Sequence, residues 1–224
     1  MKRVTFIFSI AIFLFLYSCS LKQSAALNWK VTWTNPGAGQ VRNMITENLK
    51  PDWLPVGLSS NMNKIFAFYI KAEKLKLTAK SYAVEKYDNI DSFKNTVDEK
   101  IKSYRLPIGI TQTGENFWVL YVKVKNNAKG CKIIKIKNLA NFNKSIESNS
   151  VKGFYPAALT DSDNSVIVLF VKHSAFSAKK WHLKAHSPKK GLFKKQVDME
   201  ISKGMLPVTF SYRRDRVYML YLLK

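Results

Sequence analysis

The stretch GFYPAALT, residues 153–160, marks a turn into a strand that recurs along the chain. Related stretches are WLPVGLS from residue 53, RLPIGIT from residue 105 and MLPVTFS from residue 205. Each contains a proline, and these prolines lie 52, 49 and 51 residues apart: Pro55, Pro107, Pro156 and Pro207. A nearly fixed period of this length indicates a protein built from repeated structural units.

Apolar residues precede each proline at helical spacing. Fourteen, ten and six residues before it, eleven of the twelve positions in the four copies are apolar, as in Val41, Ile45 and Leu49. An i, i+4, i+8 stripe is one face of an amphipathic helix. Gly153 and Gly204 follow two of these stripes, where a left-handed residue ends a helix. The first two copies lack this glycine, so we expect those helices to end differently.

Two strands follow each proline. Val56 and Leu58 show the period of a half-buried strand, and apolar positions resume at Ile65 and Tyr69, with counterparts in every copy. Polar turns separate the two strands: SSNMN, TQTGEN, TDSDNS and SYRRDR. In the second strand the intervening residues are also apolar. A strand that is apolar on both faces is expected at the centre of a sheet.

A third strand precedes each helix, in WKVTWT (29–34), LTAKSYAV (77–84), CKIIKIK (131–137) and WHLKAHS (181–187). The sequence therefore predicts an α+β fold of four tandem β-α-β-β units of about 50 residues. We expect the units to form a curved or closed antiparallel-rich sheet with the helices on its outer face. The predicted unit boundaries are 28–73, 74–125, 126–174 and 175–224.

The N-terminus has the pattern of a bacterial export signal. Lys2 and Arg3 precede an uncharged apolar run of about 14 residues, which is too short to span a bilayer comfortably. The motif Leu16-Tyr17-Ser18-Cys19 resembles the bacterial lipobox. This resemblance implies removal of residues 1–18, lipidation of Cys19 and a tether over 19–27. Ser20, where an aspartate would retain a lipoprotein at the inner membrane, implies the outer membrane, but not which face of that membrane carries the protein. An ordinary secretory signal with an incidental cysteine is the alternative.

The chain is strongly basic. Its formal net charge is +22, and Cys131 has no intramolecular disulfide partner if Cys19 is lipidated. Such a surface attracts anions over about a Debye length. The expected partners are the membrane through Cys19, anionic polymers or lipid head groups, or an envelope protein, with nucleic acid expected least. A lysine-rich surface that serves only solubility is the alternative.

The candidate anion-binding residues lie on or beside the strands that lead into the helices. Basic and apolar residues alternate there, so we expect the cations to face outward along one side of the repeat array. Lysines around the fourth unit make it the most basic. The candidates are Lys76, Lys80, Lys135, Lys137, Lys179, Lys180, His182 and Lys184.

The sequence offers no catalytic constellation. His182 and His186 are spaced like a zinc pair, but on a strand they lie about 13 Å apart with Lys184 between them. Asp161 begins a calcium-like loop that lacks the later glycine and glutamate. Two S-x-x-K matches, from Ser177 and Ser187, lack companion motifs. We therefore expect no metal, no cofactor and no enzymatic activity.

The repeated unit, with its GFYP turn, resembles the tandem repeats that flank the catalytic domain of polyglycine hydrolases and occur in other secreted bacterial proteins. The resemblance implies an extracytoplasmic accessory or binding role and transfers no catalytic residue. We expect a membrane-anchored binding or scaffold lipoprotein of the cell envelope that engages an anionic partner through a basic face. The alternative is an accessory or inhibitory subunit of an extracytoplasmic protein complex, which high salt would not dissociate.

Overall fold

The structure is a computed structural model that describes residues 28–49, 53–71, 79–126, 128–162 and 165–224. The predicted signal peptide, the lipidation of Cys19, the tether and Lys76 lie outside the described residues. In the described part of the chain, no helix has the length and apolar character needed to cross a bilayer.

The described elements run strand, helix, strand, strand four times. The first two rounds are β1 (Trp29–Thr34), α2 (Ala38–Asn48), β2 (Trp53–Asn61), β3 (Lys64–Lys71), β4 (Ala79–Tyr87), α3 (Ile90–Lys102), β5 (Arg105–Thr113) and β6 (Asn116–Val124). The third round contains β7 (Cys131–Ile136), the short η1 (Leu139–Asn141), α4 (Phe142–Ser150), β8 (Tyr155–Ser162) and β9 (Ser165–Val171). The short η2 (Ser174–Phe176) leads to the fourth, β10 (Lys180–His186), α5 (Lys190–Ser202), β11 (Leu206–Arg213) and β12 (Arg216–Leu223).

The strands form four separate three-stranded antiparallel sheets, with orders β1-β3-β2, β4-β6-β5, β7-β9-β8 and β10-β12-β11. The fold is thus mixed α+β, and the strands that are apolar on both faces are central, as predicted. The expectation of one curved or closed sheet is wrong. Neighbouring sheets contact one another through β2, β5, β8 and β11, and no ladder of backbone hydrogen bonds joins the described sheets.

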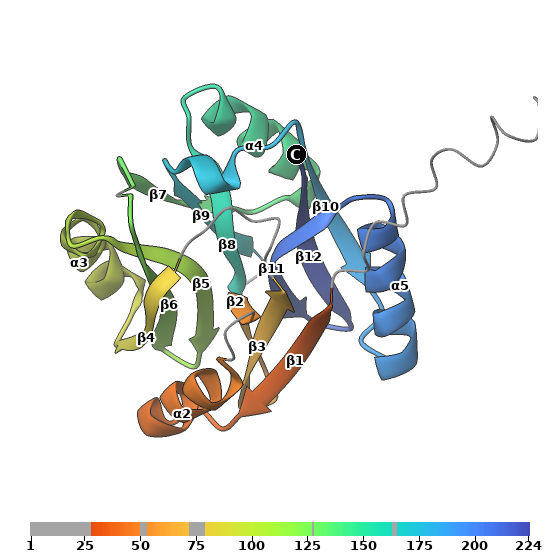
Figure 1. The fold of residues 1–224 in the computed structure, drawn as a ribbon, viewed down its shortest axis with the longest axis horizontal. Helices are drawn as coiled ribbons and strands as arrows, with labels where there is room; N and C mark the ends of the chain where they lie inside the picture. The colour runs from red at the N-terminus through yellow and green to blue at the C-terminus, as the bar shows by residue number, and fades with distance from the viewer. Residues whose placement is uncertain (1–27, 50–52, 72–78, 127, 163–164) are drawn as a thin grey trace, which may run out of the picture.

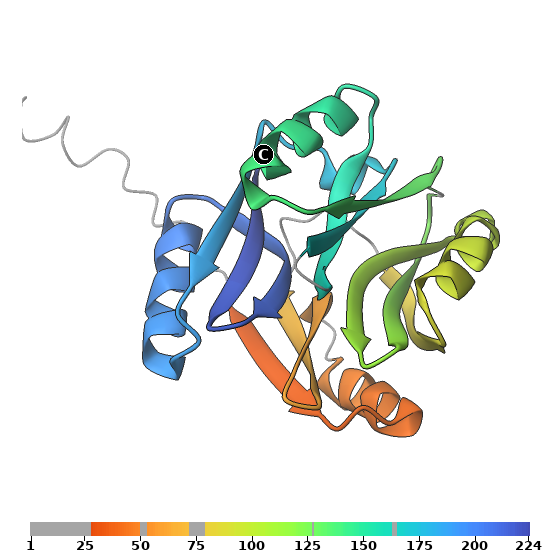
Figure 2. The same cartoon turned by 180° about the vertical axis from the view of Figure 1, so that it is seen from behind.

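The four sheets are arranged around a central axis, with helices at the periphery (Figures 1 and 2). We call β2, β5, β8 and β11, which lie nearest the axis, the inner strands. Between β8 and β11, the Leu159 amide donates to Thr209 Oγ1 at 3.4 Å and the Asp161 amide to Ser211 Oγ at 2.9 Å. Both pairs have the same offset, so these two inner strands run in the same direction.

The last inner strand also runs in the same direction as the first, because Gly57 lies against Thr209 and Ser59 lies against Tyr212. The Tyr212 amide in β11 donates to Ser59 Oγ in β2 at 2.6 Å. One end of the molecule, the hairpin end, therefore carries the strand-to-strand turns, at 61–64, 113–116, 162–165 and 213–216. The opposite end, the helix-exit end, carries the turns from helix to inner strand, including 102–105, 151–155 and 202–205.

Aromatic side chains close the ring between the first and last sheets. Trp29 in β1 stacks on Phe68 with ring centroids 5.4 Å apart, and its indole N–H donates to Asp198 of α5 at 2.8 Å. Phe193 of α5 contacts the same indole edge-on, at 5.6 Å. Fully buried Phe68 also lies 5.7 Å from Phe210 of β11. The first sheet therefore packs directly on the last sheet and helix.

The proline-containing turns have a common backbone. In every sheet the pairing register shifts one residue after the proline, which indicates a bulge at the start of each inner strand. Gly153 and Gly204 have φ of 76° and 82°, the left-handed conformation that was predicted. Tyr104 has φ of 63°, so the expectation that its helix ends differently is wrong. Tyr104 therefore follows α3 in the left-handed conformation although it is not a glycine.

Candidate functional site

The predicted anion-binding residues are placed at both ends of the molecule. Exposed Lys135 and Lys137 lie near the hairpin end, at the end of β7, whereas exposed Lys179 and Lys180 lie at the helix-exit end, where β10 begins. His182 is half-buried and Lys184 exposed, both within β10. Lys80 is in β4, but its side chain, like the whole of Lys76, is outside the described part.

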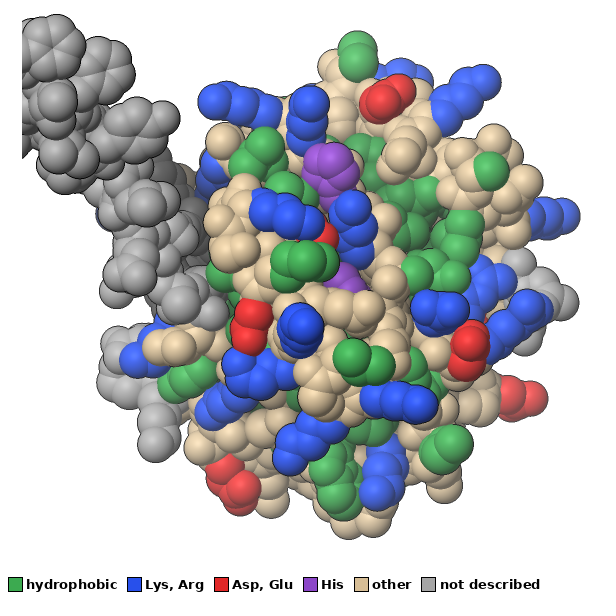
Figure 3. Space-filling view, turned by 90° about the vertical axis from the view of Figure 1, so that its right-hand side faces the viewer, with side chains coloured by type: hydrophobic (Ala, Val, Ile, Leu, Met, Phe, Trp, Pro, Cys, Tyr) green, Lys and Arg blue, Asp and Glu red, His purple; other side chains and the backbone are tan. Residues whose placement is uncertain are grey.

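These residues do not share one side of the array. Lys135 pairs with Ile167, eleven residues after Pro156, whereas Lys184 pairs with Met219, twelve residues after Pro207. Paired residues lie on the same face of a sheet, and successive positions along a strand alternate between its two faces. Because their partners stand at an odd and an even number of residues after the proline, Lys135 and Lys184 lie on opposite faces of their equivalent sheets. Figure 3, which looks onto the α5 side, shows lysine and arginine side chains spread over this surface. The expected single basic face is therefore not formed.

His186 has a packing role. It is buried, its Nε2 lies 2.8 Å from the Tyr221 hydroxyl, and its ring packs edge-on against Phe193. Burial lowers the pKa of His186, although the Glu200 charge works in the opposite direction. Among the described residues, no group of three or more His, Cys, Asp or Glu side chains is placed to hold a metal ion.

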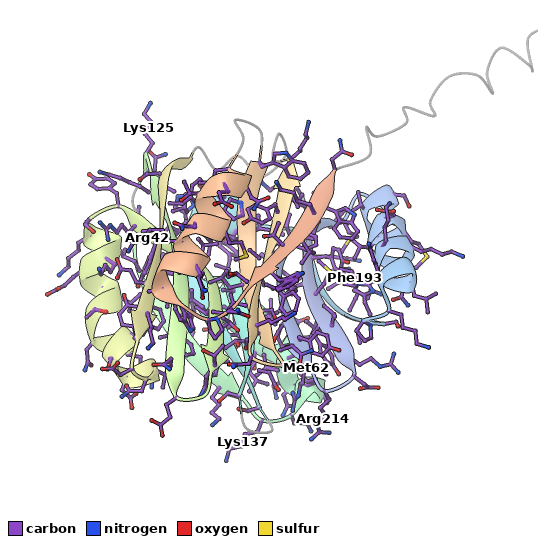
Figure 4. The ribbon with its side chains drawn as sticks, turned by 90° about the horizontal axis from the view of Figure 1, so that it is seen from below. Arg42, Met62, Lys125, Lys137, Phe193 and Arg214 are labelled. Atoms are coloured by element: carbon purple, nitrogen blue, oxygen red, sulfur yellow. The ribbon has the colours of Figure 1, made fainter. Side chains whose placement is uncertain are left out.

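A basic cleft of about 450 Å³ lies at the hairpin end, between the segment after β7 and the β11–β12 hairpin. We call it the arginine cleft. Figure 4 shows Lys137 and Arg214 at the same edge of the molecule. The residues that line it are Lys137, Asn138, Leu139, Arg213, Arg214, Asp215, Arg216 and Tyr218.

Cations outnumber anions in the arginine cleft. Arg213 Nε lies 3.0 Å from Asp161 Oδ1, while Arg216 Nε lies 3.7 Å from Asp215, whose side chain is 83% exposed. The Arg213 side chain is only 12% exposed, and its Nη1 has no hydrogen-bond partner among the described residues. A buried guanidinium N–H without a partner is costly. Oxyanions are the groups that arginine N–H donors bind best.

The β11–β12 turn sets the arrangement of the cations. Arg214 has φ of 55°, so the turn places successive side chains of the Arg213-Arg214-Asp215-Arg216 run in different directions. The stretch SYRRDR predicts a polar turn, and this cluster of cations was not predicted from it. The available signal was the presence of three arginines within four residues, at a hairpin whose counterparts carry none.

A second hollow lies beside the arginine cleft and shares Arg214 with it. Its volume is about 320 Å³. Four of its lining residues stand five positions after the prolines, one from each inner strand: Ser60, Gln112, Asp161 and Tyr212. The hairpin end therefore presents a polar depression at the meeting of the inner strands, continuous in composition with the cationic cleft.

Comparison with known proteins does not assign this arrangement. No protein-family model matches the chain, and a search of curated proteins finds no match. The resemblance to a lipobox and to secreted tandem repeats therefore remains a prediction from the sequence.

Proposed function

We propose that this chain is a membrane-anchored extracytoplasmic lipoprotein that binds an anionic partner in the arginine cleft. The observation that carries the proposal is the lining of this cleft, in which four cations, Lys137, Arg213, Arg214 and Arg216, accompany one carboxylate, that of Asp215. The anchor at Cys19, the envelope location and the outer membrane come from the lipobox-like motif. Without Lys2 and Arg3 the remaining chain still has a formal charge of +20, which favours encounter with anions.

We also propose that the chain consists of four copies of one β-α-β-β unit. Two features support this: the bulge follows the proline in each sheet, and the strand order is the same in each. In this account the repeats provide the scaffold, and the arginine cleft is a feature of one hairpin, that of the fourth unit. The lysines predicted on the strands then attract the anionic partner over a distance, and the arginines of the cleft contact it directly.

The chemistry of the arginine cleft favours phosphate, sulfate or carboxylate groups carried on a polymer or glycolipid. Arginine presents paired N–H donors that match the two oxygens of such groups. Lys137 faces the arginines from the neighbouring unit and adds a point charge. Tyr218 offers a partly exposed ring beside them. The proposed role is binding, without a chemical step.

Removal of two cleft cations tests this function. Residues 20–224 and the double variant Lys137→Gln, Arg216→Gln are titrated with lipopolysaccharide, peptidoglycan fragments, heparin and DNA at low and high salt. We expect one class of ligand to bind selectively and to bind the variant about 30-fold more weakly, because two charge-assisted contacts are lost. Arg213 is retained so that its pairing with Asp161 is unchanged.

The matched control removes the same charge elsewhere, through Lys180→Gln and Lys184→Gln on β10. The control is expected to bind nearly as tightly as the unmodified protein. Equal loss in both double variants, or binding of every polyanion that disappears near physiological salt, would mean that the charge is generic and would contradict a specific cleft.

The accessory-subunit function has support from α5. Leu192 and Met199 are about half exposed, and they stand seven residues apart, on one side of the helix. Apolar side chains presented together on a helix suit a protein interface. A stoichiometric complex that survives high salt and is lost in Leu192→Lys would favour this function.

A further inference from the structure

The described connecting segments at the helix-exit end are basic and contain no acidic residue, whereas the connections 50–52 and 72–78, which contain Asp52 and Glu73, are outside the described residues. The basic segments are 102–105, 123–130, 151–155, 172–180 and 202–205. Their cations, with the C-terminal residue, are Lys102, Arg105, Lys123, Lys125, Lys129, Lys152, Lys172, Lys179, Lys180, Lys203 and Lys224. We call this set, together with Tyr104, Val151 and Phe154, the exit face.

Backbone hydrogen bonds attach several segments of the exit face to the ends of their own sheets. The Val124 amide donates to the Tyr104 carbonyl at 3.0 Å, and the Lys129 amide donates to the Lys172 carbonyl at 3.0 Å. The Lys179 amide donates to the Leu223 carbonyl at 2.8 Å. Figure 4 shows Lys125 at the edge of the molecule opposite Lys137 and Arg214. The exit face and the arginine cleft are therefore at opposite ends.

The two ends differ in charge pattern. At the hairpin end, the described turns into strands and helices carry the acids Asp88, Glu115 and Asp215 among their cations. The described exit-face segments carry cations and no acid of their own, although Arg105 pairs with Glu85 and Lys203 with Glu200. A surface of one sign attracts an extended surface of the opposite sign more effectively than a mixed one.

Exposed apolar and aromatic groups lie among these cations. Val151 is 90% exposed and Tyr104 is 47% exposed, and each precedes a basic residue in the sequence. The Phe154 ring lies 4.3 Å from Lys132 Nζ and 5.7 Å from Lys172 Nζ. Apolar groups flanked by lysine and arginine are typical of surfaces that lie at a membrane interface.

The N-terminal chain leads to the same end. The first described residue, Asn28, accepts a hydrogen bond from the Lys71 amide at 2.9 Å, where β3 ends at the helix-exit end. Residues 20–27 reach at most about 30 Å even when fully extended. A lipid on Cys19 would therefore keep the exit face, rather than the arginine cleft, nearest the bilayer.

We propose that the exit face docks on the anionic phospholipid surface of the membrane that carries the anchor, so that the arginine cleft points away from it. The orientation rests on the proposed lipidation of Cys19, and the docking itself rests on the charge and exposed side chains of the exit face. Each lysine near an anionic surface contributes about five-fold to partitioning. Docking and cleft binding use different residues.

Vesicle partitioning tests the docking. Residues 20–224 are mixed with phosphatidylcholine vesicles with and without phosphatidylglycerol. We expect binding to the anionic vesicles only, and about 100-fold weaker partitioning for the triple variant Lys125→Gln, Lys152→Gln, Lys179→Gln. The matched control, Lys64→Gln, Lys189→Gln, Lys190→Gln at the hairpin end, is expected to partition like the unmodified protein. Equal loss in both variants, or no binding to anionic vesicles, overturns the proposal.

A dye on the full-length, processed protein in membranes tests the orientation. Val151→Cys and Met62→Cys are each made with Cys131→Ala and labelled with an environment-sensitive dye. Both sites are highly exposed, at opposite ends of the molecule. We expect a blue shift at position 151 and none at 62. A shift at 62, or none at either site, overturns the proposal. Because neither site lies in the arginine cleft, a failed cleft experiment would leave this result unaffected.

Discussion

Truncation of Phe68 to alanine lowers the free energy of unfolding by about 4 kcal/mol, measured by denaturant titration. Phe68 is fully buried and lies between Trp29 and Phe210, so it joins the first sheet to the last. Removal of the Phe68 ring leaves a cavity between the first and last sheets and takes away two aromatic contacts. We also expect faster amide exchange in β1 and β3, because these strands then depend on fewer contacts with β11 and α5.

The control for Phe68→Ala is Trp33→Ala in β1. Trp33 is 57% exposed and lies beneath Lys64 Nζ, 3.6 Å from its ring centroid, so its loss is expected to cost less than about 1 kcal/mol. If the Phe68→Ala protein is as stable as the Trp33→Ala protein, packing of Phe68 between the first and last sheets does not hold these sheets together.

Substitution of Gly109 by valine is expected to destabilise the protein by about 3 kcal/mol, through overpacking rather than a cavity. A Cβ at position 109 would lie 2.9 Å from the Leu58 backbone nitrogen and 3.2 Å from the Gly57 Cα. These are backbone atoms of the neighbouring inner strand, so they cannot move aside as the end of a flexible side chain could. The substitution therefore pushes β5 away from β2, and thermal or chemical unfolding measures the loss.

Gly39→Ala is the matched glycine control. Gly39 lies in α2, and a Cβ there would meet no atom within 4 Å, so alanine is expected to raise stability by about 0.5 kcal/mol through helix propensity. If Gly109→Val folds with unchanged stability, the inner strands do not approach as closely as described.

Much of the local fold follows from the sequence. The stripe of Val41 and Ile45 gives a helix that buries these residues, and the doubly apolar β6 is central in its sheet. Periodicity states which side of an element is buried, which is why these predictions agree with the structure. It does not state what covers that side. The same pattern suits one closed sheet or four separate sheets, and which of them forms depends on how the inner strands pack, as at Gly109 against Leu58.

The candidate site was less accessible to sequence reasoning. The predicted lysines were chosen from alternation along single strands, and register then placed Lys135 and Lys184 on opposite faces. The arginine cleft joins Lys137, which follows β7, to the β11–β12 hairpin. Such proximity depends on how neighbouring sheets pack around the axis, and the period of the repeat carries no information about it.

We propose that the protein binds two anionic partners independently, the membrane at the exit face and a ligand in the arginine cleft. The most direct measurement is titration of lipid-anchored protein, docked on phosphatidylglycerol-containing vesicles, with a heparin oligosaccharide. We predict an affinity within about three-fold of that in the absence of vesicles, since screening confines each contact to its own end. The affinity should fall in Lys137→Gln, Arg216→Gln. Displacement of the oligosaccharide by the vesicles would contradict two independent sites, because it would mean that one surface binds both the membrane and the oligosaccharide.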